Sequence, residues 1–210
     1  ERQVHGALRF IRPSRAHDYL VTRRTTRQRY AHRMPRVACA SVLLTCALFT
    51  SDAGATYSIV ATDPVTGATG AAGASCVPYE VIRILGDVPG RGTFVAQAEF
   101  DDAAFAEALE LFARGANAAE ALARVTDARA FPKAHAMQYG FADAAGNIAS
   151  ATGDEATPIA LDRRGRVGEL GYAALGNYLT SDAVVDAMGE AFEADACDLA
   201  ERLMNAIEAA

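Results

Sequence analysis

Alternating apolar and polar positions predict a series of β-strands in the second part of the chain. In residues 56–61, Tyr57 and Ile59 share one face of a strand and Ser58 lies on the other. Residues 68–76 are almost all small, so another backbone or a ligand can approach them closely. The expected strands are residues 56–61, 68–76, 92–100, 137–143, 148–152, 158–161 and 167–176, with a turn at 162–165 and a loop or short helix at 79–89.

Apolar residues at helical spacing predict four helices. The second opens with Asn117 and Glu120, which are spaced as in a capping box. The order is strands, two helices, strands and two helices, which argues against strict βαβ alternation. Helices packed outside stacked antiparallel sheets would bury the apolar faces of both, so the pattern predicts an α+β fold. The helices are expected to begin at Asp101 or Asp102, Asn117, Ser181 and Asp195.

Residues 34–55 have the organisation of a secretory signal peptide. Arg33 and Arg36 provide a basic start, residues 37–49 are apolar, and residues 53–55 (Ala-Gly-Ala) form a small-residue cleavage site. The apolar stretch is shorter than the ~20 residues needed to span a bilayer. Cleavage at this site would make Thr56 the first residue of a secreted or periplasmic protein that no longer contacts the membrane.

Two further interpretations concern the N-terminal part of the chain. Residues 43–46 (Leu-Leu-Thr-Cys) loosely resemble a lipoprotein cleavage site, which would make Cys46 the lipidated terminus and leave Thr56 internal. Residues 1–33 are rich in arginine and lack sustained periodicity. A disordered basic arm is one interpretation, but we prefer upstream sequence read through from a misplaced start and exclude these residues from the fold. The expected organisation is an upstream segment (1–33), a signal peptide (34–55) and one domain (56–210).

The charge of the chain is divided between these parts. Residues 1–55 hold ten of the 20 Lys and Arg but only three of the 26 Asp and Glu, so they carry +7 and residues 56–210 carry −13. A domain this acidic lacks the basic surface that binds nucleic acid or an anionic membrane. We therefore expect neither partner, whereas a homo-oligomer is compatible with the composition.

Residues 56–210 contain few side chains that could bind a metal ion or form a Ser-His-Asp catalytic triad. This part contains one histidine, His135, and one lysine, Lys133. A multi-histidine metal site and a four-thiolate zinc site are excluded, and no motif indicates a cofactor. A Ser-His-Asp arrangement would need His135 with Ser75 or Cys76 as the nucleophile, but the sequence around His135 favours a surface or loop residue. Cys76 and Cys197 form an even pair, so a disulfide between them is compatible with export.

Thr56 offers nucleophilic chemistry that needs no histidine. An N-terminal threonine carries both a hydroxyl and the α-amine that can take its proton. The reference pKa of an α-amine, roughly 7.7–8.0, leaves a useful fraction neutral at physiological pH. The alternative is that Thr56 is only a small residue tolerated after a signal-peptide site.

Residues 56–210 contain a succession of motifs: TYSIVATDPVTG, AGASCV, VAQAEF, QYGFADAAGNIASATG, GNYLTSDAVVDAM and CDLAERLMNAIEA. In this order they resemble a bacterial family known as DUF1028. The resemblance implies the fold of the N-terminal-nucleophile (Ntn) hydrolases, a four-layer αββα sandwich of two antiparallel sheets flanked by helices. Members usually continue beyond the last helix into another strand and carry a Trp-rich segment. This chain has no Trp and stops at Ala210, so we expect a C-terminal truncation.

The resemblance also assigns candidate site residues. Thr56 matches the threonine that opens the first strand of the family, and Gln97 matches the glutamine of its third strand. Gln138 with Gly140 matches a Q-x-G motif, and residues 176–177 match a G-N motif. Lys133 matches no motif of the family. The expected site therefore consists of Thr56 as the nucleophile, Asn177 as an oxyanion donor, Asp63 orienting the amine, and Gln97 and Gln138.

These observations predict an exported hydrolase that cleaves a small amide or peptide-like substrate. Thr56 would attack the carbonyl carbon, its α-amine would act as the base, and Asn177 with backbone amides would hold the oxyanion. A secreted binding or scaffold domain that keeps the fold without catalysis is the alternative. A third hypothesis is a thiol enzyme centred on Cys76.

Overall fold

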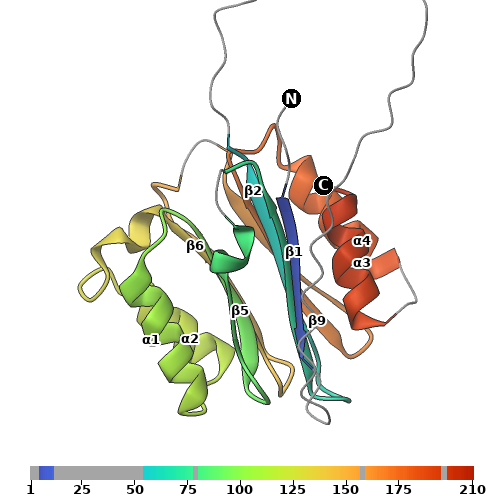
Figure 1. Cartoon of the computed structure of the whole chain (residues 1–210), viewed down its shortest axis with the longest axis horizontal. Helices are drawn as coiled ribbons and strands as arrows, with labels where there is room; N and C mark the ends of the chain where they lie inside the picture. Colours follow the sequence, from blue (N-terminus) through green and yellow to red (C-terminus); the bar gives the residue numbers. More distant parts are fainter. Residues whose placement is uncertain (1–4, 12–53, 78–79, 157–158, 195–197) are drawn as a thin grey trace, which may run out of the picture.

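The computed structural model describes residues 5–11, 54–77, 80–156, 159–194 and 198–210. They form four layers, with a pair of helices outside each of two facing β-sheets (Figure 1). The expected α+β, four-layer αββα sandwich is confirmed. The helices are α1 (Asp102–Ala113), α2 (Ala118–Val125), α3 (Ala183–Ala194) and α4 (Leu199–Glu208), with 3-10 turns η1 (Val81–Ile84) and η2 (Pro132–Ala136).

Both sheets are antiparallel. The first has the order β1-β3-β2-β9-β8 and the second the order β4-β5-β6-β7. The first sheet consists of β1 (His5–Ile11), β3 (Ala68–Ser75), β2 (Thr56–Asp63), β9 (Leu170–Asn177) and β8 (Leu161–Val167). The second sheet consists of β4 (Leu85–Val88), β5 (Gly92–Ala98), β6 (Met137–Asp143) and β7 (Ile148–Thr152).

The alternation of β2 decides which side chains enter the space between the sheets. Ile59 lies at 0% exposure in the core that packs under α3 and α4, together with Tyr57. Val60, from the other face, packs between the sheets against Val95 and Leu175. Thr56 and Ser58 share this inner face with Val60, because residues two apart on a strand point the same way. The nucleophile candidate therefore lies between the sheets.

Gly140 on β6 lets the two sheets approach each other. A Cβ atom at this position would lie 2.7 Å from Leu175 Cδ1 and 3.0 Å from Val60 Cγ1, both on the opposite sheet. We expect Gly140→Ala to lower the free energy of unfolding by about 1–3 kcal/mol, because an overpacked core must shift its backbone or rotamers. Denaturant titration measures this. Gly73→Ala is the control, since its Cβ would meet nothing closer than 3.5 Å, and an equal loss in both variants would contradict the packing argument.

Most of the expected elements agree with the structure. The predicted strands 137–143 and 148–152 coincide with β6 and β7. Asp101 caps α1 by accepting from the backbone N–H groups of the first turn, and Asn117 with Glu120 forms the capping box of α2. The fourth helix begins at Leu199 with Asp198 as its cap rather than at Asp195, which lies outside the described residues.

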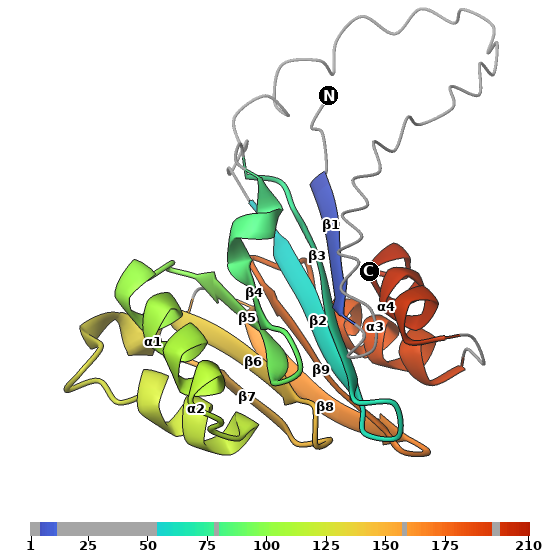
Figure 2. The same ribbon diagram turned by 60° about the horizontal axis from the view of Figure 1, so that its bottom comes forward.

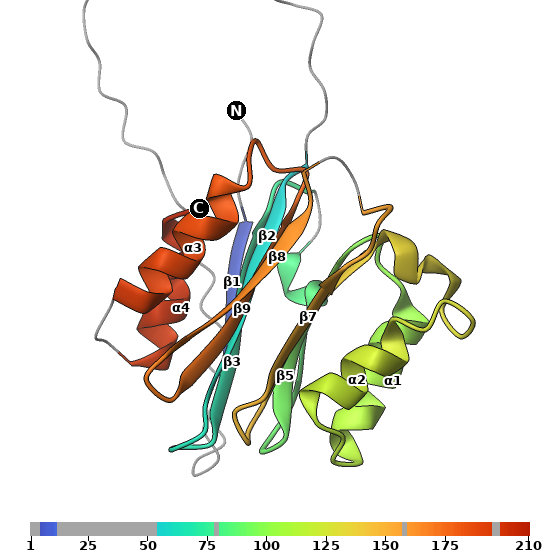
Figure 3. The same cartoon turned by 180° about the vertical axis from the view of Figure 1, so that it is seen from behind.

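The expected turn at residues 162–165 is wrong, because these residues lie inside β8. The strand lies at the edge of its sheet and is partly exposed, so its Asp and Arg side chains have the composition of a turn (Figure 3). The turn instead contains Gly168, whose φ of 57° favours glycine. β4 was also missed within the expected loop at 79–89, because a four-residue strand gives little periodicity.

Residues His5–Ile11 join the fold, so the exclusion of residues 1–33 is wrong for this strand. β1 pairs antiparallel with β3, from His5 opposite Ser75 to Ile11 opposite Thr69 (Figure 2). The edge of a sheet presents unpaired N–H and C=O groups, which accept a strand through backbone bonds whatever its side-chain period. The rest of the predicted upstream segment and signal peptide, apart from residues 54 and 55, lies outside the described residues. Within the described residues, no helix has the length and apolarity to cross a membrane.

Candidate active site

Thr56 begins β2 at one end of the inner layer, between two neighbouring strands. It pairs with Ser75 on β3 and with Asn177 on β9. Directly paired residues place their side chains on the same face of a sheet, so these three polar groups lie together between the sheets. The Thr56 hydroxyl is 2.7 Å from Ser75 Oγ, and Thr56 is only 8% exposed. The Ser75 hydroxyl oxygen also accepts from the backbone N–H of Val77 at 3.3 Å.

Next to Thr56, a buried network of hydroxyl and amide side chains connects the first sheet with the second. Ser58 Oγ donates to Gln97 Oε1 at 2.6 Å, and Gln97 Nε2 donates to Gln138 Oε1 at 3.0 Å. Asn177 Nδ2 donates to the same Gln138 oxygen at 2.9 Å. The structure thus brings together four of the five expected site residues: Thr56 and Asn177 on the first sheet, Gln97 and Gln138 on the second.

The orientation of the Gln138 amide is fixed from its other side. Its Nε2 lies within hydrogen-bond distance of Thr152 Oγ1 (3.0 Å) and of the carbonyl oxygens of Leu161 (3.1 Å) and Gly176 (2.9 Å). Three acceptors around Nε2 require the NH2 group there, so Oε1 must face Gln97 and Asn177. The hydroxyl of Thr152 in turn donates to Asp162 Oδ1 at 2.7 Å.

Asp162 joins the edges of the two sheets. It accepts from Thr152 Oγ1 and, at 2.6 Å, from Ser150 Oγ, and both hydroxyls come from β7 while Asp162 lies on β8. β7 and β8 lie side by side in Figure 3. Asp162 was expected in a turn, and Ser58 and Thr152 were not among the expected site residues. Ser75 was considered only as a nucleophile partnered by His135. The strand register, which a single sequence does not reveal, is what brings them to the site.

We expect Asp162→Ala to lower the free energy of unfolding by about 1–3 kcal/mol, because two charge-assisted hydrogen bonds lose their acceptor in a partly buried place. Thermal unfolding measures the effect. The control is Asp154→Ala, which removes an exposed carboxylate that lies 3.0 Å from His135 Nδ1. Such a surface pair contributes about 0–1 kcal/mol. If the two variants were equally stable, Asp162 would not hold the sheets together.

A cavity of about 470 Å³ opens beside Thr56. Its buried part is polar, with Thr56, Ser75 and Gln97, and η1 and the segment after β5 form the rest of its wall. Its size is in the range of small-molecule sites, which occupy roughly 300–1,000 Å³. The other residues that line it are Val77, Glu80, Val81, Arg83, Ile84, Ala98, Glu99 and Phe100.

The backbone at Ala98 is strained where β5 meets the cavity. Its φ of 71° lies in the left-handed region, which costs a non-glycine residue about 1–3 kcal/mol. The strand ends here, so Gln97 stays in the buried network while Glu99 and Phe100 turn into the wall of the cavity. Strain of this kind is often found at functional sites, and it marks this wall as a place to look for substrate contacts.

Asp63 does not belong to the site. It ends β2, seven residues from Thr56, which corresponds to about 23 Å along a strand. Its carboxylate accepts from the backbone N–H of Val65 at 2.9 Å and from the Thr66 hydroxyl at 2.7 Å. The expected role in orienting the amine is therefore wrong, and Asp63 shapes the turn between β2 and β3.

The other candidates lie outside the cavity beside Thr56. His135 lines a separate hollow of about 180 Å³ with its partner Asp154. Lys133 Nζ is 3.4 Å from the Phe100 carbonyl oxygen and does not line the cavity. Cys76 is a free thiol, and the disulfide with Cys197, which the sequence left open, concerns a residue outside the described ones. Burial, and then the nearby Cys76, raise the pKa of Tyr57.

No group of three or more His, Cys, Asp or Glu side chains within the described residues has an arrangement that could hold a metal ion.

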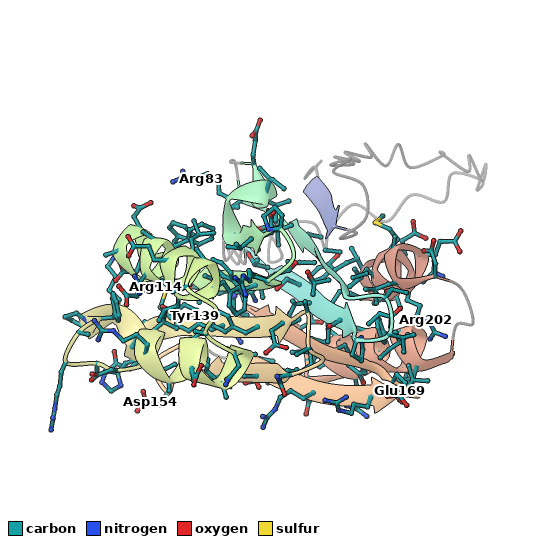
Figure 4. The ribbon with its side chains drawn as sticks, turned by 90° about the horizontal axis from the view of Figure 1, so that it is seen from below. Arg83, Arg114, Tyr139, Asp154, Glu169 and Arg202 are labelled. Carbon is teal, nitrogen blue, oxygen red and sulfur yellow. The ribbon has the colours of Figure 1, made fainter. Side chains whose placement is uncertain are left out.

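Tyr139 has an unusual environment. It lies on β6, and its side chain packs in the core next to α1 and α2 (Figure 4). Its hydroxyl is buried and has no hydrogen-bond partner among the described residues, and burial raises its pKa. It packs with Phe141 rather than against the cavity, so it does not contribute to this site.

A family model described as a family of unknown function, DUF1028, matches residues 56–210. The chain belongs to the DUF1028 family. Among solved structures, it is similar to the DUF1028 protein SPO2555 from Silicibacter pomeroyi, with 29% sequence identity and a TM-score of 0.62 over 74% of this chain and 69% of that one. A comparison with curated proteins finds no match. The DUF1028 match begins at Thr56, the residue that opens the inner strand of the site.

Proposed function

We propose that this DUF1028 protein is an exported amide hydrolase of the N-terminal-nucleophile type. Thr56 becomes its nucleophile once cleavage after Ala55 makes it the first residue. The observation that carries the proposal is the position of Thr56: a nearly buried hydroxyl, held by Ser75 at 2.7 Å, at the inner end of a 470 Å³ cavity. The agreement of the cleavage site with the start of the family match supports it.

Removal of the preceding residues supplies the base. In the uncleaved chain, the Ala55 carbonyl oxygen accepts from the backbone N–H of Cys76 at 3.1 Å, and the Thr56 nitrogen is an amide that cannot take a proton. Cleavage converts it into an α-amine on the residue that bears the hydroxyl. With a reference pKa of roughly 7.7–8.0, this amine acts as a general base near neutral pH.

The residues around Thr56 define a balanced reaction. As Thr56 Oγ1 bonds to the substrate carbonyl carbon, the neutral α-amine takes the hydroxyl proton. In this proposal Asn177 and backbone amides hold the oxyanion. Asn177 is not among the residues that line the cavity, but it pairs with Thr56 across the strands, and its bond to Gln138 uses one of its two N–H groups. When the C–N bond breaks, the ammonium proton passes to the leaving amine and an ester remains on Thr56. Water, deprotonated by the same amine, cleaves the ester, and the proton returns to Thr56 Oγ1.

The proposal is tested with two forms of the domain, one beginning at Thr56 and one beginning at Ala55. Both keep the Thr56 side chain, but only the first has the amine beside its hydroxyl. We expect hydrolysis of a panel of small amides, and labelling by a threonine-directed covalent probe, for the first form alone. The terminus of the exported protein, determined by N-terminal sequencing, should be Thr56. Equal activity of the two forms, or another mature terminus, would contradict the mechanism.

A binding or scaffold domain is the second candidate, and one observation favours it. Gln97, Gln138 and Asn177 satisfy one another by hydrogen bonds, as purely structural polar groups do. A domain of this kind would bind a small molecule in the cavity but would resist the probe even when it begins at Thr56. Ligand binding without labelling would establish this alternative.

A further inference from the structure

The outer part of the cavity beside Thr56 carries charges of both signs. Arg83 projects from η1, and its guanidinium carbon lies 5.8 Å from the centre of the Phe100 ring (Figure 4). A cation–π contact of this kind uses no N–H group of the guanidinium, so these groups stay available to a ligand. None of the ion pairs found among the described residues involves Arg83. A carboxylate on a ligand would therefore find a pre-positioned partner.

Two carboxylates line the same cavity as Arg83. Glu80 lies just before η1, and Glu99 follows the strained residue Ala98 at the end of β5. Both side chains are exposed, and neither takes part in an ion pair found among the described residues. A carboxylate that is exposed and lacks a basic partner is available to an ammonium group.

The charged groups lie at the exposed rim of the cavity, whereas the candidate nucleophile lies at its buried end. Thr56, Ser75 and Gln97 are 8%, 1% and 1% exposed, so they form the inner end of the cavity. Arg83, Glu80 and Glu99 are exposed and form its rim. The apolar side chains of Val81 and Ile84 also line the cavity. A ligand with an amide at the inner end would thus present its other end to the charged rim.

A bound ligand displaces water from these charged groups. Each charged group that loses its water raises the free energy of the complex unless the ligand supplies a group of opposite charge. A neutral ligand leaves both signs unpaired. An anion satisfies Arg83 but faces two glutamates, whereas a cation satisfies a glutamate but faces Arg83. Only a ligand that carries both an ammonium and a carboxylate pairs with both signs at once.

We propose that the substrates are amides that carry a free amino-acid head group, with the carboxylate bound by Arg83 and the ammonium bound by Glu99 and Glu80. The amide to be cleaved lies on the rest of the molecule, at Thr56. This inference rests on the proposed function for the position of the amide. The recognition of the head group depends only on the rim.

Binding is measured on the Thr56→Ala domain, which cannot turn the ligands over, by titration calorimetry. Four ligands share one side-chain amide and differ in the charges of the head group: glutamine (zwitterion), N-acetylglutamine (anion), glutamine α-amide (cation) and N-acetylglutamine α-methylamide (neutral). We expect glutamine to bind at least about tenfold more tightly than each of the others, because it forms charge-assisted hydrogen bonds of both signs. Binding of any other member as tightly as glutamine would overturn the inference.

Variants of the rim assign the partners. Arg83→Gln should weaken the binding of glutamine about tenfold without weakening that of glutamine α-amide, which has no carboxylate for Arg83 to bind. The double variant Glu80→Gln, Glu99→Gln should weaken the binding of glutamine without weakening that of N-acetylglutamine, which has no ammonium. The matched control is Lys133→Gln, which removes a positive charge that contacts the same wall through the Phe100 carbonyl without lining the cavity. It should bind glutamine as the parent does. An equal loss in Lys133→Gln and Arg83→Gln would show a general charge effect and overturn the inference.

The form of the domain that begins at Thr56, assayed with the same ligands, separates this inference from the proposed function. Charge-selective binding to the Thr56→Ala domain, combined with no hydrolysis by the form that begins at Thr56, would support the ligand class and contradict the hydrolase. Hydrolysis of all four amides at similar rates would support the hydrolase and overturn the ligand class.

Discussion

Thr56→Ala is expected to reduce amide hydrolysis about 10⁴-fold or more, because losing the nucleophile of a covalent mechanism removes its first step entirely. The alanine variant keeps the α-amine and the cavity but has no oxygen to form the ester. Thr56→Ser keeps both the hydroxyl and the amine, so it should retain substantial activity. Initial rates on the best amide of the panel, with the mature terminus verified by mass, measure both variants.

The control for this prediction is a buried threonine in the same layer. Thr69 lies between the sheets near their opposite end, is 4% exposed, and places its hydroxyl 2.8 Å from that of Thr93. Thr69→Ala removes the same kind of buried hydroxyl bond as Thr56→Ala but lies on the other side of the inner core. It should lose comparable stability and keep its activity. Parallel losses of activity in both variants would mean that Thr56 acts through the fold rather than through chemistry.

The family and the layer order were predictable from the sequence because their signals are local or ordered along the chain. Helix caps such as Asn117 with Glu120 are fixed by residues three apart, and the structure shows this capping box. The hairpin 137–152 has strong alternation on both sides of a glycine-containing turn. Two elements at sheet edges were missed, because the backbone pairing that places β1 and β8 at the edges of their sheet leaves no signature in a single sequence.

The candidate site was predictable only in part, for a related reason. Thr56, Gln97, Gln138 and Asn177 came from motif positions, and the structure brings them together. Asp63, near the first turn, was expected to orient the amine, but it lies seven residues along the strand from Thr56 and therefore far from the site. The partners Ser75 and Asp162 depend on strand register and on the contact between the two sheets. Both follow from long-range packing and leave no signature at fixed spacing.

Gln138 is the most connected side chain of the polar network. Gln138→Met nearly preserves the volume of the side chain but removes every hydrogen bond it makes. Gln97 Nε2 and Asn177 Nδ2 would lose their acceptor, and the carbonyl oxygens of Leu161 and Gly176 would lose a donor. Each buried group left unsatisfied costs about 1–3 kcal/mol, partly relieved by rearrangement.

We therefore expect Gln138→Met to lower the free energy of unfolding by about 4 kcal/mol, and the melting temperature by about 10 °C for a domain of this size. The matched variant is Gln97→Met, which breaks only the bonds to Ser58 and Gln138 and should cost about half as much. Denaturant titrations of both give the comparison. If Gln138→Met were no more destabilising than Gln97→Met, Gln138 would not be the centre of the network. The bond to Gln138 would then not explain how the side chain of Asn177 is held beside Thr56.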